Sequence, residues 1–135
     1  MNDKSFLSPE SVIHLLNAGL AIEYSTIIHF PRIIGLQQNK DISKQLEWVL
    51  TDSMTHASII SSHIKRLGGE PDWSFQPFPE NKTVIEFLKI QSDLELKTKS
   101  LYETTLPMSD TENFHRDLEI IIIAEQKHWL ILIDV

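Results

Sequence analysis

Four long segments of the chain carry apolar residues at three- and four-residue spacing, a pattern that restricts the chain to an all-α fold. They begin near Ser8, Asp41, Thr83 and Thr111, and the stretches between them collect Gly, Pro, Asn and Asp. Short connections join the first segment to the second and the third to the fourth, whereas a long one joins the second to the third. The sequence therefore predicts an antiparallel four-helix bundle with a long crossover between helices two and three, in one domain covering residues 1–135.

Local signals place several helix ends. Ser8 is a suitable N-cap, and Pro9 follows it at the first helical position. Pro31 lies inside the first apolar stripe and predicts a kink or a local break there. The second helix should stop at Gly68-Gly69-Glu70-Pro71, because glycine supplies a left-handed cap and proline cannot continue the helix.

The long connection carries aromatic residues that a polar linker would lack. Prolines and aromatics alternate in it: Pro71, Trp73, Phe75, Pro77, Phe78 and Pro79. We therefore expect an ordered crossover that lies along the bundle.

Composition excludes several classes of site. The chain has no cysteine, so any metal must be held by carboxylates and imidazoles rather than by thiolates. Its formal charge of −7 comes without a run of Lys and Arg, which argues against nucleic-acid binding. Residues 1–7 contain no signal-peptide core, and the apolar run at 120–123 is too short to span a bilayer, so we expect a cytoplasmic protein with no membrane partner.

Five polar residues interrupt the apolar stripes of the four predicted helices, and each lies in phase with apolar neighbours on its own helix. They are Glu23, His56, Glu95, Glu125 and His128. Glu125 and His128 form a Glu-x-x-His pair, which puts both side chains on one side of a helix. Taken alone, each residue is more often a paired or boundary residue than a ligand. Together they match the way bundles hold two metal ions, and oxygen with imidazole donors suits iron or manganese.

The other candidate residues are weaker. His63 lies one heptad after His56 and could be a core histidine, a partner of a ligand or an extra ligand. His29 lies off the stripe of Glu23, and His14 and His115 look like surface or end residues. Tyr102 is expected to pack in the core, where its hydroxyl could hydrogen-bond a ligand.

Several strings resemble the bacterioferritin and rubrerythrin branch of the ferritin-like superfamily, over about Pro9 to Leu132. They are Leu-Asn-Ala-Gly-Leu-Ala-Ile-Glu-Tyr (16–24), Met-Thr-His-Ala (54–57), Arg-Leu-Gly-Gly-Glu-Pro (66–71), Leu-Glu-Leu-Lys (94–97), Leu-Tyr (101–102) and Glu-Gln-Lys-His-Trp (125–129). The family pattern is Glu, Glu-x-x-His, Glu and Glu-x-x-His on successive helices. The resemblance implies a di-iron site on Glu23, His56, Glu95, Glu125 and His128.

One position departs from this pattern. The second helix should carry a bridging glutamate three residues before His56, and Ser53 stands there. Asp52 is a possible substitute ligand, although its side chain is shorter. We therefore expect unequal occupancy, with the tighter ion nearer Glu125 and His128. In helix three, Lys97 is a rival for the ligand position but lies off the stripe that Glu95 shares.

The resemblance also bears on haem and on assembly. Met54 occupies the place where bacterioferritins use a methionine as haem ligand, but relatives without haem carry it too, so we do not expect haem. We expect no short fifth helix of the kind found in closed cages. Apolar residues remain on the outer faces of helices one and two: Ile13, Ile28, Trp48 and Ile59. We expect a homodimer or another small oligomer.

Three functions are compatible with the sequence. The first is a ferritin-like di-iron or Fe/Mn protein that oxidises Fe(II) or a small substrate with O₂ or peroxide, a possible ferroxidase or di-iron oxidase. The second is a degenerate bundle that binds one metal or none and acts as a binding or structural module, which Ser53 favours. The third is a ligand-binding bundle whose buried carboxylates pair with Lys or Arg.

Overall fold

The computed structural model describes residues 8–75, 77 and 82–135, and within these ranges every regular element is helical. The elements are α1 (Pro9–Leu36), α2 (Lys40–Arg66), α3 (Val84–Thr105), a 3₁₀ turn η2 (Leu106–Met108) and α4 (Glu112–Ile133). The predicted all-α, four-helix architecture is confirmed, with helix ends within one or two residues of those expected.

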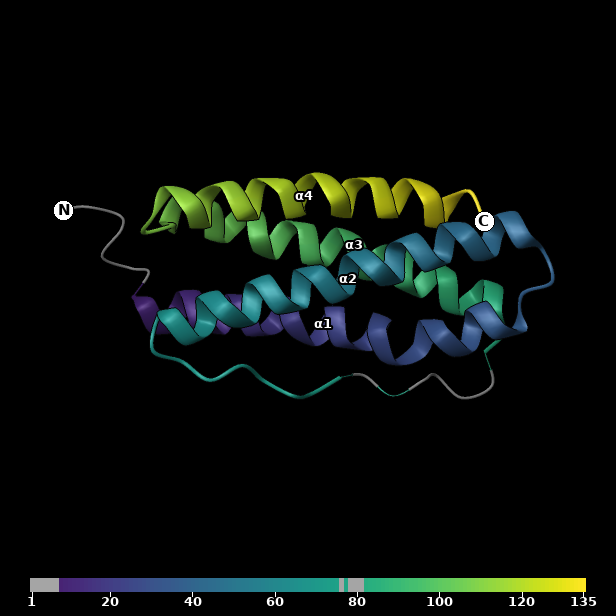
Figure 1. The fold of residues 1–135 in the computed structure, drawn as a ribbon, viewed down its shortest axis with the longest axis horizontal. Coiled ribbons are helices and arrows are strands. Elements are labelled where there is room, and N and C mark those ends of the chain that lie inside the picture. Colours follow the sequence, from purple (N-terminus) through teal and green to yellow (C-terminus); the bar gives the residue numbers. More distant parts are fainter. Residues whose placement is uncertain (1–7, 76, 78–81) are drawn as a thin grey trace.

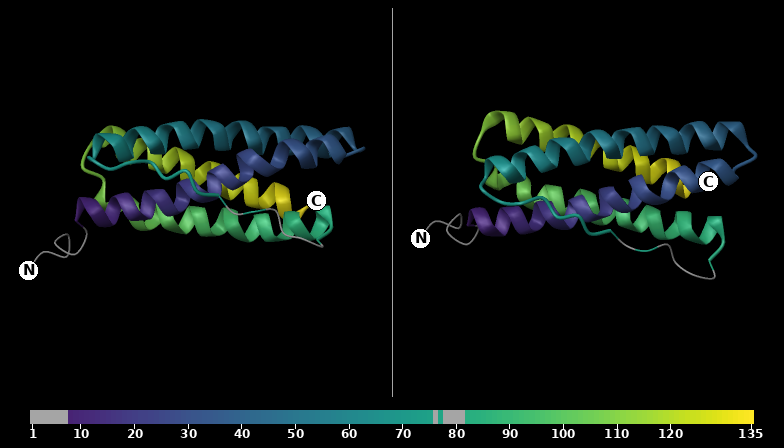
Figure 2. Two further views of the ribbon diagram at one scale, coloured as in Figure 1. Left: turned by 90° about the horizontal axis from the view of Figure 1, so that it is seen from below. Right: turned by 60° about the horizontal axis from the view of Figure 1, so that its bottom comes forward.

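The four helices pack side by side as an antiparallel bundle (Figure 1). Helix α1 contacts α2 and α3, and α4 contacts α3 and α2, so neighbouring helices run in opposite directions. Residues 67–75, the described first part of the segment between α2 and α3, run back along the outside of the bundle (Figure 2). This long return lets α2 and α3 run in the same direction.

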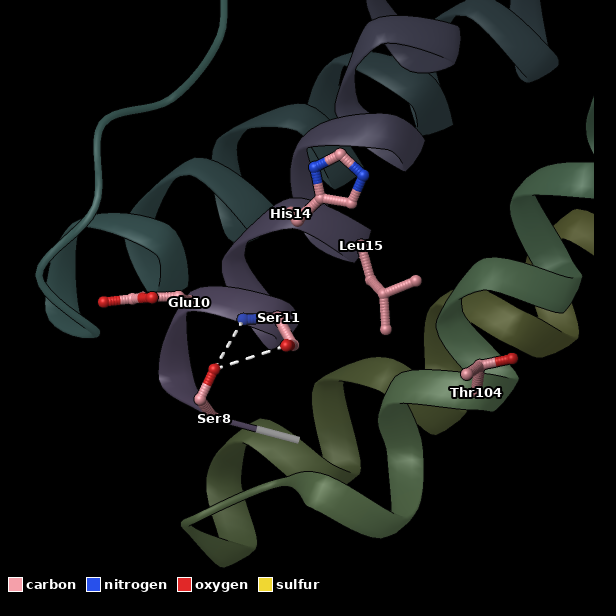
Figure 3. A pocket seen from close by; sticks show the side chains of 6 residues that line it. All are labelled: Ser8, Glu10, Ser11, His14, Leu15 and Thr104. Atoms are coloured by element: carbon pink, nitrogen blue, oxygen red, sulfur yellow. Dashed lines mark hydrogen bonds between the residues drawn. The ribbon is translucent and has the colours of Figure 1, made fainter. Parts of the chain in front are cut away.

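Each helix begins with a side-chain cap on the residue before it. The Ser8 hydroxyl accepts a hydrogen bond from the Ser11 backbone N–H at 3.2 Å, as predicted (Figure 3). Asn39 and Thr111 cap α2 and α4 in the same way. Thr83 forms a reciprocal capping box with Glu86 at the start of α3. The surface hollow beside Ser8 is lined by none of the five predicted site residues.

Helix α2 ends in the left-handed turn that its sequence predicted. Gly68 has φ of 93°, and its N–H donates to the Lys65 carbonyl, while the Gly69 N–H donates to the Ile64 carbonyl. This pair of hydrogen bonds is the Schellman motif, which satisfies carbonyl groups left free at the helix end.

Helix α1 continues through Pro31 to Leu36, so the predicted local break is absent. Pro31 is exposed. Proline removes one backbone N–H donor from the helix. At an exposed position this loss is least destabilising, because water can solvate the carbonyl group that is left without a partner. By length and composition α1 could also cross a bilayer, but one side of it is buried in the bundle, as expected of a core helix.

Two apolar clusters form the core, one toward each end of the bundle. The first contains Val12, Leu16, Leu20, Ala57, Ile60, Ile64, Tyr102, Phe114, Leu118 and Ile121. The second contains Phe30, Ile33, Leu46, Val49, Phe87, Leu88 and Leu132. Along every helix, the buried polar residues of the bundle centre lie between the positions of these two clusters.

The described first part of the crossover is fastened to α1, as expected for an ordered segment. Both ends of the Asn17 side-chain amide hold it, through hydrogen bonds with Glu70 O at 3.2 Å and Asp72 N at 2.8 Å. Trp73 stacks on Tyr24 with ring planes 4° apart. Phe78, the third aromatic residue of the prediction, lies outside the described residues.

Gly19 gives a first test of this packing. A Cβ atom at Gly19 would lie 2.5 Å from the ring of Tyr102, whereas a Cβ atom at Gly35 on the same helix would meet nothing within 4 Å. We expect Gly19→Ala to lower the free energy of unfolding by about 1–3 kcal/mol through overpacking.

Gly35→Ala is the matched control, and its better helix propensity should leave stability unchanged or raise it by up to about 1 kcal/mol. Urea unfolding followed by circular dichroism measures both changes. Equal effects of the two substitutions would contradict the close packing of Tyr102 against α1.

Candidate metal centre

All five residues predicted from the interrupted stripes meet in the polar layer at the centre of the bundle. Their exposed fractions are 1% for Glu23, 5% for His56, 1% for Glu95, 0% for Glu125 and 1% for His128. The four helices each contribute at least one of them, so the predicted convergence is confirmed. Lys97, the rival to Glu95, is exposed on α3.

The first group joins helices α1, α2 and α4. His56 Nδ1 lies 2.9 Å from Glu125 Oε1 and 3.3 Å from Glu23 Oε2. One donor atom from each of these three buried residues lies within 4.8 Å of the others, a spacing that suits a shared metal ion.

The second group joins helices α3 and α4. His128 Nδ1 lies 3.5 Å from Glu95 Oε2 and 3.8 Å from Glu125 Oε2. These donor atoms also lie within 4.8 Å of one another. The rings of His56 and His128 stack with centroids 5.9 Å apart, so the two groups are adjacent.

Glu125 belongs to both groups, with Oε1 directed to His56 and Oε2 nearest to His128. Each group then has two carboxylates and one imidazole. The expected preference of one ion for Glu125 and His128 stays a prediction, although Glu125 contributes an oxygen to both groups. The donor types do not distinguish the two positions.

Two donor atoms of the cluster are buried without a hydrogen-bond partner among the described residues: Glu125 Oε2 and His128 Nδ1. Buried polar atoms in native proteins nearly always have a partner. Both atoms face other donors of the cluster. A cation held between them would satisfy both, so the residues present fit a metal ion.

The charge balance of the cluster points the same way. Burial raises the pKa of Glu125 well above its ordinary value, and the neighbouring Glu23 and Glu95 carboxyl groups raise it further. Burial also raises the pKa of Glu23, although His56 offsets part of this effect. The layer therefore favours added positive charge, either as protons or as metal ions.

Asp52 lies behind His128 rather than in the cluster. Its Oδ2 atom is 2.8 Å from His128 Nε2, the ring nitrogen opposite the one near Glu95 and Glu125. The structure thus gives the Asp52 carboxylate a contact on the far side of the His128 ring, and its role as a substitute ligand stays a prediction. A proton on Nε2 donates to Asp52, and Nδ1 is then free to face the cluster.

Two further side chains orient the glutamates. The Tyr102 hydroxyl donates to Glu23 Oε2 at 3.3 Å, which agrees with the expectation that Tyr102 could hydrogen-bond a ligand. Gln91 Nε2 donates to Glu95 Oε1 at 3.2 Å and to Thr26 Oγ1 at 2.7 Å. Sequence reasoning missed Gln91 and Thr26, although Gln91 lies four residues before Glu95 and so shares its helix face.

The remaining histidines lie away from the cluster. His63 Nε2 is 2.8 Å from Asp117 Oδ2, and Arg66 donates to the other ring nitrogen, so His63 links α2 to α4 without joining the five residues. His29 is buried against Phe87, although its position off the stripe of Glu23 suggested otherwise. His14 and His115 are exposed, as expected.

Asp52→Ala should weaken metal binding at the position of His128 by about 10–100-fold, because the ring loses the partner that fixes its orientation. Glu47→Ala, an exposed residue on the same helix, is the control and should have no effect. Anaerobic Fe(II) titration by equilibrium dialysis measures the change. An unchanged affinity in Asp52→Ala would show that this carboxylate does not support the site.

No protein-family model matches the sequence, and no curated protein matches it. Solved structures match it closely in fold. A ferritin-like, diiron-carboxylate protein from Bacillus anthracis superposes with a TM-score of 0.82 and 25% identity, over 98% of this chain and 96% of that chain.

Two other solved structures show the same fold at lower identity. The bacterioferritin-related protein from Bacteroides fragilis, described as a dodecameric thioferritin, has a TM-score of 0.78 and 17% identity, over 94% of this chain and 84% of that chain. The bacterioferritin of Desulfovibrio desulfuricans, described with a diiron site, has a TM-score of 0.75 and 23% identity, over 99% of this chain and 82% of that chain. With four helices in the same arrangement and two candidate metal-binding groups of Glu and His at the centre, the chain belongs to the ferritin-like superfamily.

Proposed function

We propose that the bundle binds two iron ions, or one iron and one manganese, and oxidises Fe(II) or a small substrate with O₂ or peroxide. One observation carries the proposal: two buried Glu/His groups share Glu125, and two of their donor atoms have no hydrogen-bond partner within residues 8–75, 77 and 82–135. A shared carboxylate supports two adjacent cations because it offsets part of their mutual repulsion.

The structural relatives support the same metal. The Bacillus anthracis protein is named a diiron-carboxylate protein, and the Desulfovibrio desulfuricans bacterioferritin is described with a diiron site. The donors of this chain are carboxylate oxygens and imidazole nitrogens, which suit iron and manganese.

The protein's own residues would fix ligand geometry and exclude bulk water. Asp52 holds His128, Tyr102 holds Glu23 and Gln91 holds Glu95, so three of the five donors are oriented by a neighbour. The two apolar clusters on either side of the polar layer lower the local dielectric and strengthen its electrostatic interactions. Bound iron would supply electrons for the reduction of O₂ or peroxide.

Metal analysis of the purified chain tests the proposal. We expect Fe(II) to bind in the bundle under anaerobic conditions and to be oxidised when O₂ or peroxide is added, with absorbance changes that require Glu23 and Glu95. Absence of metal binding would overturn the proposal.

The third candidate, a bundle with carboxylates paired to Lys or Arg, has no support among the described residues, since no Lys or Arg contacts the five donors there.

Ser53 favours one alternative, a degenerate bundle that binds one metal or none. It is fully buried in the polar layer, where the family pattern has a bridging glutamate. The number of metal ions bound per chain distinguishes this alternative from the proposed two-ion site. One bound iron ion per chain that is not oxidised by O₂ or peroxide would support the alternative.

We also propose that the chain forms a homodimer or another small oligomer. Ile28 and Trp48 are about half exposed, at 50% and 53%, on the outer faces of α1 and α2. Ile13 and Ile59 were expected to be exposed too, but they pack partly against the core. Sedimentation at micromolar concentration should give a species of a few subunits, and either a monomer or a cage of many subunits would contradict this.

A further inference from the structure

The Ser53 hydroxyl is an unsatisfied polar group at the centre of the bundle. Its exposed fraction is 0%, and Oγ has no hydrogen-bond partner among the described residues. Serine and threonine in helices usually donate to the carbonyl four residues earlier, as Ser25, Thr98 and Thr105 do here at 2.8–3.0 Å. Ser53 does not, so its hydroxyl remains available to something else.

Ser53 lies three residues before His56 on α2, one helical turn away on the same side. Its neighbour Asp52 contacts His128 Nε2, so this turn of α2 lies beside His128, a member of the second group. Glu125 Oε2 and His128 Nδ1, which also have no hydrogen-bond partner in the described part of the chain, belong to that group. Three unsatisfied polar atoms therefore belong to the same layer of the bundle.

The charge of the donor set leaves room for one anion. Three carboxylates carry one negative charge fewer than is needed to neutralise two divalent cations. Net charge is costly in a layer that is almost completely buried. One additional monoanion would bring the donor set and two divalent cations to neutrality.

The difference in size between serine and the glutamate of the family pattern suggests the size of that anion. A glutamate side chain exceeds serine by as many non-hydrogen atoms as a formate ion contains. A planar oxyanion of this size could bridge two cations as a carboxylate side chain does, and the Ser53 hydroxyl could donate a hydrogen bond to it.

We propose that the site is completed by an external small oxyanion, a carboxylate or carbonate, which lies beside Ser53 and accepts a hydrogen bond from its hydroxyl. This inference rests on the proposed metal site and specifies the ligand class that the site takes up from solution. The organic source is a small monocarboxylate, and the inorganic source is bicarbonate.

The test uses the full-length chain, freed of metal and titrated anaerobically with Fe(II) in a buffer without carboxylate or carbonate. Adding sodium formate or sodium bicarbonate should raise the affinity for the second ion by about tenfold or more. A response to formate alone assigns the organic source, and a response to bicarbonate alone assigns the inorganic source. With Mn(II) in place of Fe(II), electron paramagnetic resonance should change from isolated ions to a coupled pair when the anion is added.

Three variants make the test specific. Ser53→Glu supplies the carboxylate within the chain, so it should bind two ions without added anion and lose the response. Ser53→Ala should need about tenfold more formate or bicarbonate, because a hydrogen bond to a charged group is lost. Ser61→Ala is the control, since its hydroxyl is also unpartnered but lies eight residues further along α2, and it should behave as native.

The possible failures are distinct. If native protein binds two ions equally tightly with and without either anion, the external ligand is wrong while the metal site stands. The same holds if Ser53→Ala leaves the anion response unchanged. If neither native protein nor Ser53→Glu binds metal under any of these conditions, the proposed metal site is wrong and this inference falls with it.

Discussion

Glu125→Gln should abolish tight binding of both metal ions, whereas Glu23→Gln and Glu95→Gln should each remove one. The reason is geometric, since Glu125 contacts His56 through one oxygen and lies nearest to His128 through the other. An amide has nearly the same volume as the carboxyl group but carries no negative charge, so it leaves no cavity and cannot neutralise two cations. The loss should exceed about 100-fold in affinity at each position.

Fe(II) or Mn(II) titration by equilibrium dialysis measures this result under conditions in which native protein loads fully. Glu119→Gln is the matched control, because Glu119 is exposed on the same helix, and it should bind metal as native protein does. Retention of one tight ion by Glu125→Gln would contradict the sharing of this carboxylate.

The metal-free protein should lose stability as the pH rises from about 5 to 8, and loaded metal should reverse this loss. Burial, together with Glu23 and Glu95, raises the pKa of Glu125 well above its ordinary value, so the folded chain retains a proton that the unfolded chain has released. Folding then becomes less favourable with rising pH, because the unfolded state binds fewer protons than the folded state.

Of the other titratable groups of the layer, His128 adds to this loss of stability and Glu95 does not affect it between pH 5 and 8. Burial lowers the pKa of His128, but the carboxylates of Glu95 and Asp52 outweigh it and raise the pKa, so the stability that its proton confers is also lost as the pH rises. Burial raises the pKa of Glu95, but the contacts of its carboxyl group with Glu125 and His128 outweigh burial. The pKa of Glu95 therefore lies below its ordinary value of 4.5. It therefore does not oppose the trend between pH 5 and 8.

Thermal unfolding of chelator-treated and Mn(II)-loaded protein across this pH range measures the effect. Metal at 100 times its Kd should stabilise the fold by about 2.7 kcal/mol, and this gain should grow with pH as the ligands lose their protons. Glu125→Gln should flatten the slope of the metal-free protein. A melting temperature of metal-free native protein that rises with pH over the same range would show that the layer does not hold these protons.

The sequence predicted the helices and the five residues of the donor set because both depend on local spacing. The cap at Ser8, the turn at Gly68 and the in-phase positions of Glu23 and Glu95 each follow from residues within one or two turns of the same helix. The resemblance to the ferritin-like pattern, rather than spacing, implied that Ser53 occupies a ligand position. Such patterns need no knowledge of neighbouring helices.

Tertiary structure alone decided how these residues are paired. Helical spacing fixes the direction of a side chain about its own axis, but not its level along the bundle relative to other helices. That level makes Glu125 common to both groups and places Asp52 on the far side of His128. It also joins Gln91 to Thr26, residues 65 positions apart, because contacts between side chains of different helices depend on how the helices pack.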